Sequence, residues 1–180
     1  VGDGIVEFVP QGFDQTKTPS LILKEEPTAK GSVPSDWELY PQFTVVDGKA
    51  NASLSLTGEI SLYGGGEVTG PLLRNGQYIK LWNTDTGAYG VDGGKRLYQS
   101  HPWVLGVRRD GSAFGILFDS SWKSELHTNS DKIEFNTEGA LFRIYIITQR
   151  CPQRSCRTDR NHHDACPLDS GIPSMSFLLR

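Results

Sequence analysis

The chain of 180 residues lacks several features that mark particular classes of protein. Its first 150 residues contain no cysteine, which excludes disulfides there and is compatible with either redox compartment. No apolar run is long enough to span a membrane. The net charge of −3 gives no basis for binding nucleic acid or an anionic membrane, so we expect neither partner. An initiator methionine and a signal-like segment are also missing, so we expect the natural start to lie upstream and assign no localisation.

Helical periodicity is absent before residue 150, where short β-rich runs alternate with turn residues. Asp47-Gly48 separates the runs 43–46 and 50–56, and Asp110-Gly111 separates 103–109 from 112–118. Asp-Gly between alternating runs predicts a β-hairpin, because a primed turn needs positive φ at both central residues. About ten such strands with glycine turns predict an all-β fold, an antiparallel β-sandwich over residues 1–150.

The run 113–118 differs from the other predicted strands because both of its alternating sets are apolar. Ala113, Gly115 and Leu117 alternate with Phe114, Ile116 and Phe118. This pattern predicts a strand in the middle of the sandwich that is covered on both faces.

Three consecutive glycines follow a predicted strand in the segment Tyr63–Glu67. They can support a close crossing of two backbone segments. A phosphate-binding loop would also need a following helix N-terminus and a Lys-Ser/Thr pair, and the sequence has neither. Glu67 is a candidate for a structural ion pair with Arg74 or Lys80.

The segment 82–90 has the chemistry of sugar recognition. A predicted strand over 78–82 leads into a loop that combines aromatic, amide, hydroxyl and carboxylate groups. An indole can pack on a pyranose face, while Asn83 or Asp85 can bind vicinal hydroxyls. The alternative is an Asx-turn, in which Asn83 and Asp85 bond to their own backbone. His101 has no Asp, Ser or Cys at a spacing that predicts a catalytic triad.

Several motifs occur in an order that resembles the N-terminal β-sandwich of glycoside hydrolase family 31, the α-glucosidase and α-xylosidase family. The motifs are Tyr63-Gly64-Gly65-Gly66-Glu67, Gly70-Pro71-Leu72, Arg74, Trp82-Asn83-Thr84-Asp85, Leu97-Tyr98-Gln99-Ser100-His101-Pro102 and Phe114-Gly115-Ile116-Leu117-Phe118. The resemblance covers residues 40–150 well and residues 1–40 loosely.

The resemblance implies a galactose-mutarotase-like sandwich that precedes a catalytic (β/α)₈ barrel and packs against it. A sandwich loop would reach over the barrel mouth, and its aspartate would contact the α-linked sugar substrate. By position that residue is Asp85, and Asn83, Thr86 and Gly87 would shape the loop. Both catalytic carboxylates of such retaining enzymes would lie in the barrel. We therefore expect no catalytic residue, no cofactor and no activity in this chain alone.

Two alternatives remain open at this point. The chain can be a stand-alone carbohydrate-binding sandwich that needs no barrel. It can also be a mutarotase-like epimerase, which needs a histidine and a glutamate facing each other in one cleft; His101 and Glu67 are the candidate pair.

Residues 151–180 have a different composition from the rest of the chain. They contain all three cysteines, and the types present at Cys151, Cys156, His162, His163 and Cys166 can bind zinc. The two histidines are adjacent, which departs from the usual spacing, so we expect no metal site. The tail can be back-translated into degenerate codons and these codons read one base later. The shifted reading permits the peptide A-L-N-E-V-V-E-L-T-G and then W-T-L-G-Y-Q, a series that resembles the family's junction with its barrel. We therefore expect a frameshifted, unstructured tail.

Overall fold

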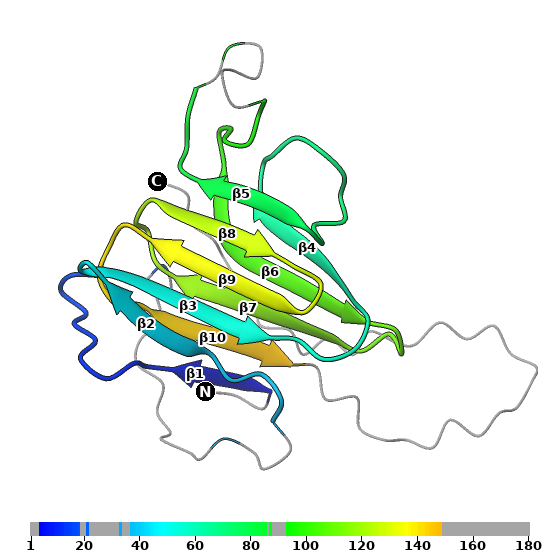
Figure 1. The fold of residues 1–180 in the computed structure, drawn as a ribbon, viewed down its shortest axis with the longest axis horizontal. Helices are drawn as coiled ribbons and strands as arrows, with labels where there is room; N and C mark the ends of the chain where they lie inside the picture. The colour runs from blue at the N-terminus through cyan, green and yellow to red at the C-terminus, as the bar shows by residue number, and fades with distance from the viewer. Residues whose placement is uncertain are drawn as a thin grey trace, which may run out of the picture.

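The computed structural model describes residues 4–18, 21, 33, 37–85, 87 and 93–148, which form two five-stranded antiparallel sheets packed face to face (Figure 1). Sheet A contains, in spatial order, β1 (Ile5–Phe8), β10 (Arg143–Thr148), β7 (Ala113–Asp119), β6 (Ser100–Arg108) and β4 (Ile60–Gly66). Sheet B contains β2 (Gln42–Val46), β3 (Lys49–Ser55), β9 (Lys132–Thr137), β8 (Ser124–Thr128) and β5 (Gln77–Leu81). These residues include no α-helix, so the predicted all-β sandwich is confirmed.

The tail predicted for residues 151–180, including the five alternative zinc ligands, lies outside the described residues. No helix that could span a bilayer occurs in the part of the chain that the structure describes.

Both predicted hairpins form, but with different turns. Between β2 and β3, Asp47 has φ 50° and Gly48 has φ 75°, as a primed turn requires. Between β6 and β7, Gly111 has φ 85° whereas Asp110 is not left-handed. There the Gly111 amide donates to the Arg108 carbonyl (3.0 Å), and the Asp110 carboxylate accepts from the Ser112 amide (2.9 Å). This turn is a type I turn followed by a left-handed glycine, the usual geometry of a three-residue hairpin loop.

The core lies between the two sheets and is built from alternate side chains of their strands. Phe118 of sheet A stacks on Phe135 of sheet B with ring centroids 4.5 Å apart. Strand β7 is buried on both faces, because Leu117 on its outer side is only 3% exposed. The Trp103 ring lies directly over Gly115 on that outer side, where a Cβ atom would overlap it. The prediction of a doubly covered strand is confirmed.

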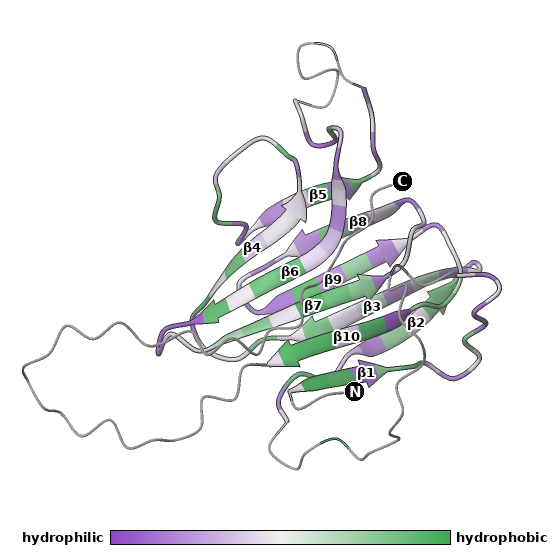
Figure 2. Ribbon diagram, turned by 180° about the vertical axis from the view of Figure 1, so that it is seen from behind, coloured by the Kyte–Doolittle hydropathy of each residue, from purple (hydrophilic) through white to green (hydrophobic). Residues whose placement is uncertain are grey.

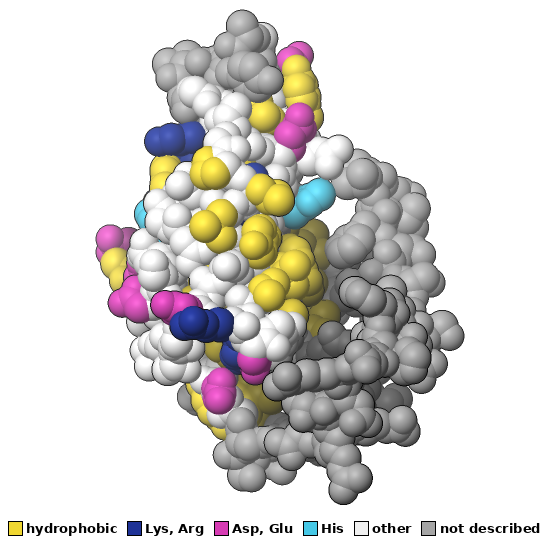
Figure 3. Space-filling model, turned by 90° about the vertical axis from the view of Figure 1, so that its right-hand side faces the viewer, with side chains coloured by type: hydrophobic (Ala, Val, Ile, Leu, Met, Phe, Trp, Pro, Cys, Tyr) yellow, Lys and Arg dark blue, Asp and Glu magenta, His cyan; other side chains and the backbone are white. Residues whose placement is uncertain are grey.

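The outer faces of the two sheets differ in chemistry. On sheet A, Trp103, Leu105 and Val107 of β6 share a face with Leu117, and Leu105 is 37% exposed. Figure 2 shows β7 and β10 as hydrophobic along most of their length, and Figure 3 shows hydrophobic side chains gathered in one patch on the side it presents. Sheet B instead presents polar residues on alternate positions of β3, β8 and β9. One sheet therefore offers an apolar surface and the other a polar one.

The three glycines at the end of β4 allow a close approach between the sheets. Gly64, Gly65 and Gly66 all have positive φ, and the pairing of β4 with β6 shifts register between Gly64 and Gly66. A Cβ atom on Gly65 would lie 2.6 Å from Cδ1 of Ile79 in β5 of the other sheet. Added Cβ atoms on Gly64 and Gly66 would overlap the backbone carbonyls of Trp103 and Gln99, so the predicted close approach of two backbone segments is confirmed. The buried Arg74 supports it by donating from Nε to the Gly64 carbonyl (3.2 Å), and not to the Glu67 carboxylate considered above.

Candidate functional site

The segment that carries Asp85 leaves sheet B at the end of β5 and returns to sheet A at β6. Its two arms are joined where the Thr84 amide donates to the Leu97 carbonyl (2.8 Å). The returning arm is also tied to the connection between β4 and β5, because the Thr69 hydroxyl donates to the Gly93 carbonyl (2.6 Å). These hydrogen bonds bring two loops together at one end of the sandwich and hold the base of the Asp85 segment.

Asp85 is exposed and has a partner on the opposite arm. The Tyr98 hydroxyl donates to Oδ1 of Asp85 at 3.0 Å. This bond, followed by the negative charges of Asp85 and Glu67, raises the pKa of Tyr98 above its ordinary value of 10.0. An ionised carboxylate can accept several hydrogen bonds, so Asp85 can bond a ligand hydroxyl while it keeps Tyr98. A tethered carboxylate at an exposed loop is suited to binding a polyol.

The other predicted site residues are only partly brought together. Asn83 and Gly87 are exposed in the same segment as Asp85, and Thr86 lies outside the described residues. The Asp85 carboxylate accepts from Tyr98, thirteen positions away, a contact that an Asx-turn alone does not provide. Sequence reasoning missed Tyr98 as a site residue. Tyr98 belongs to the Leu97–Pro102 motif, but this motif does not indicate which carboxylate the Tyr98 hydroxyl contacts.

The pair considered for an epimerase, His101 and Glu67, does not form an enclosed site. Both residues are exposed, and the Glu67 amide donates to the Gln99 carbonyl (2.8 Å) beside the start of β6. Neither lines either of the two cavities described below. Within the described ranges, no three His, Cys, Asp or Glu side chains gather as metal ligands would.

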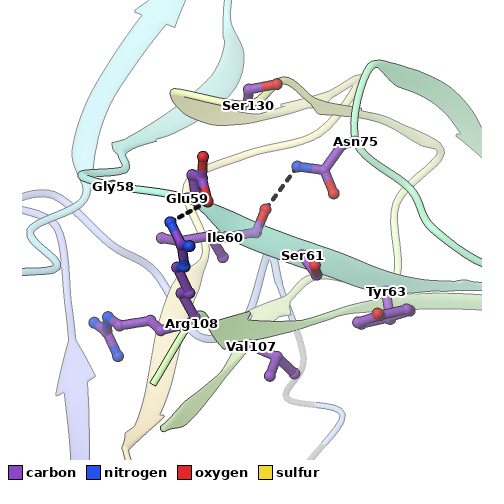
Figure 4. Close-up of a pocket in the computed structure, with 10 residues that line it drawn as sticks. Gly58, Glu59, Ile60, Ser61, Tyr63, Asn75, Val107, Arg108 and Ser130 are labelled. Carbon is purple, nitrogen blue, oxygen red and sulfur yellow. Dashed lines mark hydrogen bonds and ion pairs between the residues drawn. The ribbon is translucent and has the colours of Figure 1, made fainter. Parts of the chain in front are cut away.

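A cavity of about 390 Å³ lies at the other end of β4 and β6 from Asp85 (Figure 4). Glu59 and Arg109 form an exposed ion pair at its rim (3.5 Å). Asn75 donates from Nδ2 to the Ile60 carbonyl (2.8 Å) and accepts from the Leu62 amide through Oδ1 (2.8 Å), so it fixes the edge of β4. These roles are structural. A second cavity, of about 300 Å³, lies on sheet B beside Trp82.

Comparison with known protein families gives one match over most of the sandwich. Residues 13–126 match the family described as the glycosyl hydrolase 31 N-terminal galactose mutarotase-like domain. Among curated relatives, alpha-glucosidase 2 of Bacillus thermoamyloliquefaciens is 32% identical over 129 residues, which cover 65% of this chain and 16% of the relative. The alpha-glucosidase of Hordeum vulgare is 37% identical over 92 residues, covering 50% of this chain and 10% of that protein.

Solved structures give the same result. A family 31 alpha-glucosidase from Bacteroides thetaiotaomicron is 64% identical with a TM-score of 0.54, over 61% of this chain and 19% of that one. A GH31 dextranase from Flavobacterium johnsoniae, solved with isomaltotriose, is 29% identical with a TM-score of 0.52. The match covers 60% of this chain and 13% of the dextranase. The chain therefore spans less than a fifth of the length of these relatives.

Proposed function

The chain belongs to the glycosyl hydrolase 31 N-terminal galactose mutarotase-like domain family, and from this membership we propose that it serves as the non-catalytic supporting lobe of an α-glycosidase. The observation that carries the proposal is the match of the sandwich to only 16% of the alpha-glucosidase 2 of Bacillus thermoamyloliquefaciens. The parent enzyme would hydrolyse terminal α-linked sugars. Its two catalytic carboxylates would lie in the remaining, larger part, which the family resemblance identifies as a barrel.

In this proposal Asp85 binds the substrate at the mouth of that barrel. Its carboxylate is exposed, and Tyr98 limits its movement, which lowers the conformational entropy lost when a sugar binds. A charge-assisted bond from a sugar hydroxyl to Asp85 would then contribute to affinity. Asn83, Thr86 and Gly87 would shape the same segment.

The apolar outer face of sheet A is the surface that would pack on the barrel. Trp103, Leu105 and Val107 form its accessible part, next to the buried Leu117. Contiguous apolar surface of this kind marks interaction sites in soluble proteins. Strand β10, which ends at Thr148, belongs to the same sheet. The polar face of sheet B would stay in solvent.

The test uses the full-length enzyme that contains this domain. Asp85→Asn keeps the size of the side chain but removes the charge, so we expect KM for maltose to rise at least about tenfold, since one charge-assisted bond contributes roughly 1.5–3 kcal/mol. Asp131→Asn is the matched control, because Asp131 is exposed in the turn between β8 and β9. Unchanged kcat/KM in the Asp85 variant would refute the role given to Asp85.

A stand-alone carbohydrate-binding sandwich is the second candidate, favoured by the exposure of Trp82 (49%) beside Asp85. Calorimetric titration of the isolated chain with maltose and isomaltose separates the two. The supporting-lobe proposal predicts no measurable heat of binding, because Asp85 would form only one wall of a pocket whose other walls belong to the barrel. Binding in the millimolar range or tighter would favour the second candidate.

A further inference from the structure

The outer face of sheet B carries a polar surface that the proposed function does not use. Strand register aligns four of its side chains in one row across the sheet. Asn51 lies opposite Asn136, Asn136 lies opposite Glu125, and Glu125 lies opposite Lys80. All four are half-buried, so each keeps some of its polar atoms accessible. The row offers hydrogen-bond donors and acceptors at the spacing of neighbouring strands, about 4.8 Å.

The cavity of about 300 Å³ beside Trp82 lies over this row. Trp82 borders it at the end of β5, and Arg96 borders it from the segment that precedes β6. Lys49, Lys123 and Glu138 line the cavity as well. The volume is at the lower end of the range for small-molecule sites, and the lining combines one large aromatic ring with many polar groups.

The cavity has an excess of positive charge. Its ionisable lining consists of four cations and two carboxylates: Lys49, Lys80, Arg96, Lys123, Glu125 and Glu138. Both carboxylates already accept hydrogen bonds, Glu138 from Lys123 Nζ (2.8 Å) and Glu125 from the Tyr78 hydroxyl. The bond from Lys123 lowers the pKa of Glu138, so this carboxylate is ionised at neutral pH and the pair is neutral. A ligand in the cavity therefore meets a net positive surface.

We propose that this cavity binds an oligosaccharide that carries carboxylate or sulfate groups. The indole of Trp82 would pack on one face of a sugar ring, as aromatic side chains do on apolar surfaces. The amides of Asn51 and Asn136 would bond its hydroxyls. The Lys80 ammonium group would form a charge-assisted bond with its acidic group. Asp85 does not line this cavity, so the proposal does not depend on the proposed function.

The test is calorimetric titration of this chain with tetragalacturonate, with a sulfated tetrasaccharide and with neutral maltotetraose. We expect at least one acidic ligand to bind, with an affinity that falls as salt is added, and maltotetraose to bind at least about tenfold more weakly. The two acidic ligands distinguish a carboxylate from a sulfate as the recognised group.

Lys80→Met should weaken binding of the acidic ligand at least about tenfold, and Trp82→Ala should do the same through lost ring contact. Lys132→Met is the matched control, because Lys132 lies on the same sheet, pairs with Glu134 (2.6 Å) and does not line the cavity. Three results would overturn the proposal: no binding of either acidic ligand, equal binding of maltotetraose, or equal loss in the Lys132 variant.

Discussion

At the scale of single residues, Arg143 organises a buried polar cluster on the outer side of sheet A. It pairs with Glu7 (3.2 Å) and Asp119 (3.4 Å), and the Tyr145 hydroxyl also donates to Glu7 (2.9 Å). Phe13 lies 5.3 Å from the Arg143 guanidinium group and covers it. Burial, then the bond to Glu7, raises the pKa of Tyr145 far above its ordinary range. The cluster joins β1, β7 and β10 of the sheet to the segment that follows β1.

Arg143→Ala should lower the free energy of unfolding by about 3 kcal/mol, because it leaves the carboxylates of Glu7 and Asp119 buried without their cation. Arg109→Ala is the control, since Arg109 is 86% exposed and its pair with Glu59 contributes about 0–1 kcal/mol. Urea denaturation of both variants measures the difference. Similar losses in the two variants would mean that the buried cluster does not stabilise the sheet.

Tyr98 is the residue whose titration reports the geometry of the Asp85 segment. Asp85 is the main cause of its raised pKa, so Asp85→Asn should lower the midpoint of Tyr98 ionisation towards 10.0. The difference between the ultraviolet titrations of each protein and its Tyr98→Phe counterpart isolates this one tyrosine among six. Asp110→Asn, at the other end of β6, should leave the midpoint unchanged. An unaltered midpoint in the Asp85 variant would show that the two arms do not meet in solution.

At the scale of elements, local sequence signals predicted the strands and two hairpins well. Asp47-Gly48 and Asp110-Gly111 specify turns through the backbone freedom of their own residues, so no distant contact is needed. The order of strands within each sheet was not predictable, because it depends on pairings between distant segments such as β1 with β10. The bulge at the end of β4 could be predicted only in part. The sequence shows its three glycines, but it does not show which strands lie against them.

Gly66→Ala tests the bulge. Gly66 has φ 87°, and an added Cβ atom would overlap the Gln99 carbonyl and lie 2.8 Å from the His101 amide nitrogen. Gly58→Ala is matched in φ (83°) but has no atom within 4 Å of the added carbon. We expect about 1–2 kcal/mol of destabilisation at Gly58 from backbone strain alone and about 1–3 kcal/mol more at Gly66. Equal effects in thermal or urea unfolding would contradict the close approach of β4 and β6.

At the scale of the whole molecule, the sandwich has an apolar outer face on sheet A and a polar outer face on sheet B. The apolar strand pattern predicted that one outer face would be covered, since both faces of 113–118 are hydrophobic. The role of Asp85 could not be derived from composition, because an exposed carboxylate in a loop stabilises a turn as often as it binds a ligand. It came from the resemblance to a family, and it stays a prediction. Its contact with Tyr98 required the fold.

The frameshift predicted for residues 151–180 also stays a prediction. The nucleotide sequence around codon 150 tests it directly, because a shifted frame that continues into a barrel would support it and its absence would refute it. This result bears on the length of the natural protein and leaves the described sandwich unchanged.

The central claim is that this chain supports and completes an α-glycosidase without performing its chemistry. The most direct test is an assay of the purified chain alone for hydrolysis of p-nitrophenyl α-D-glucopyranoside and maltose. The full-length enzyme, assayed separately, is the positive control. The account predicts release of nitrophenol and glucose at the uncatalysed rate only, because both reactive carboxylates would lie in the proposed barrel. Turnover by the isolated chain above that rate would contradict it.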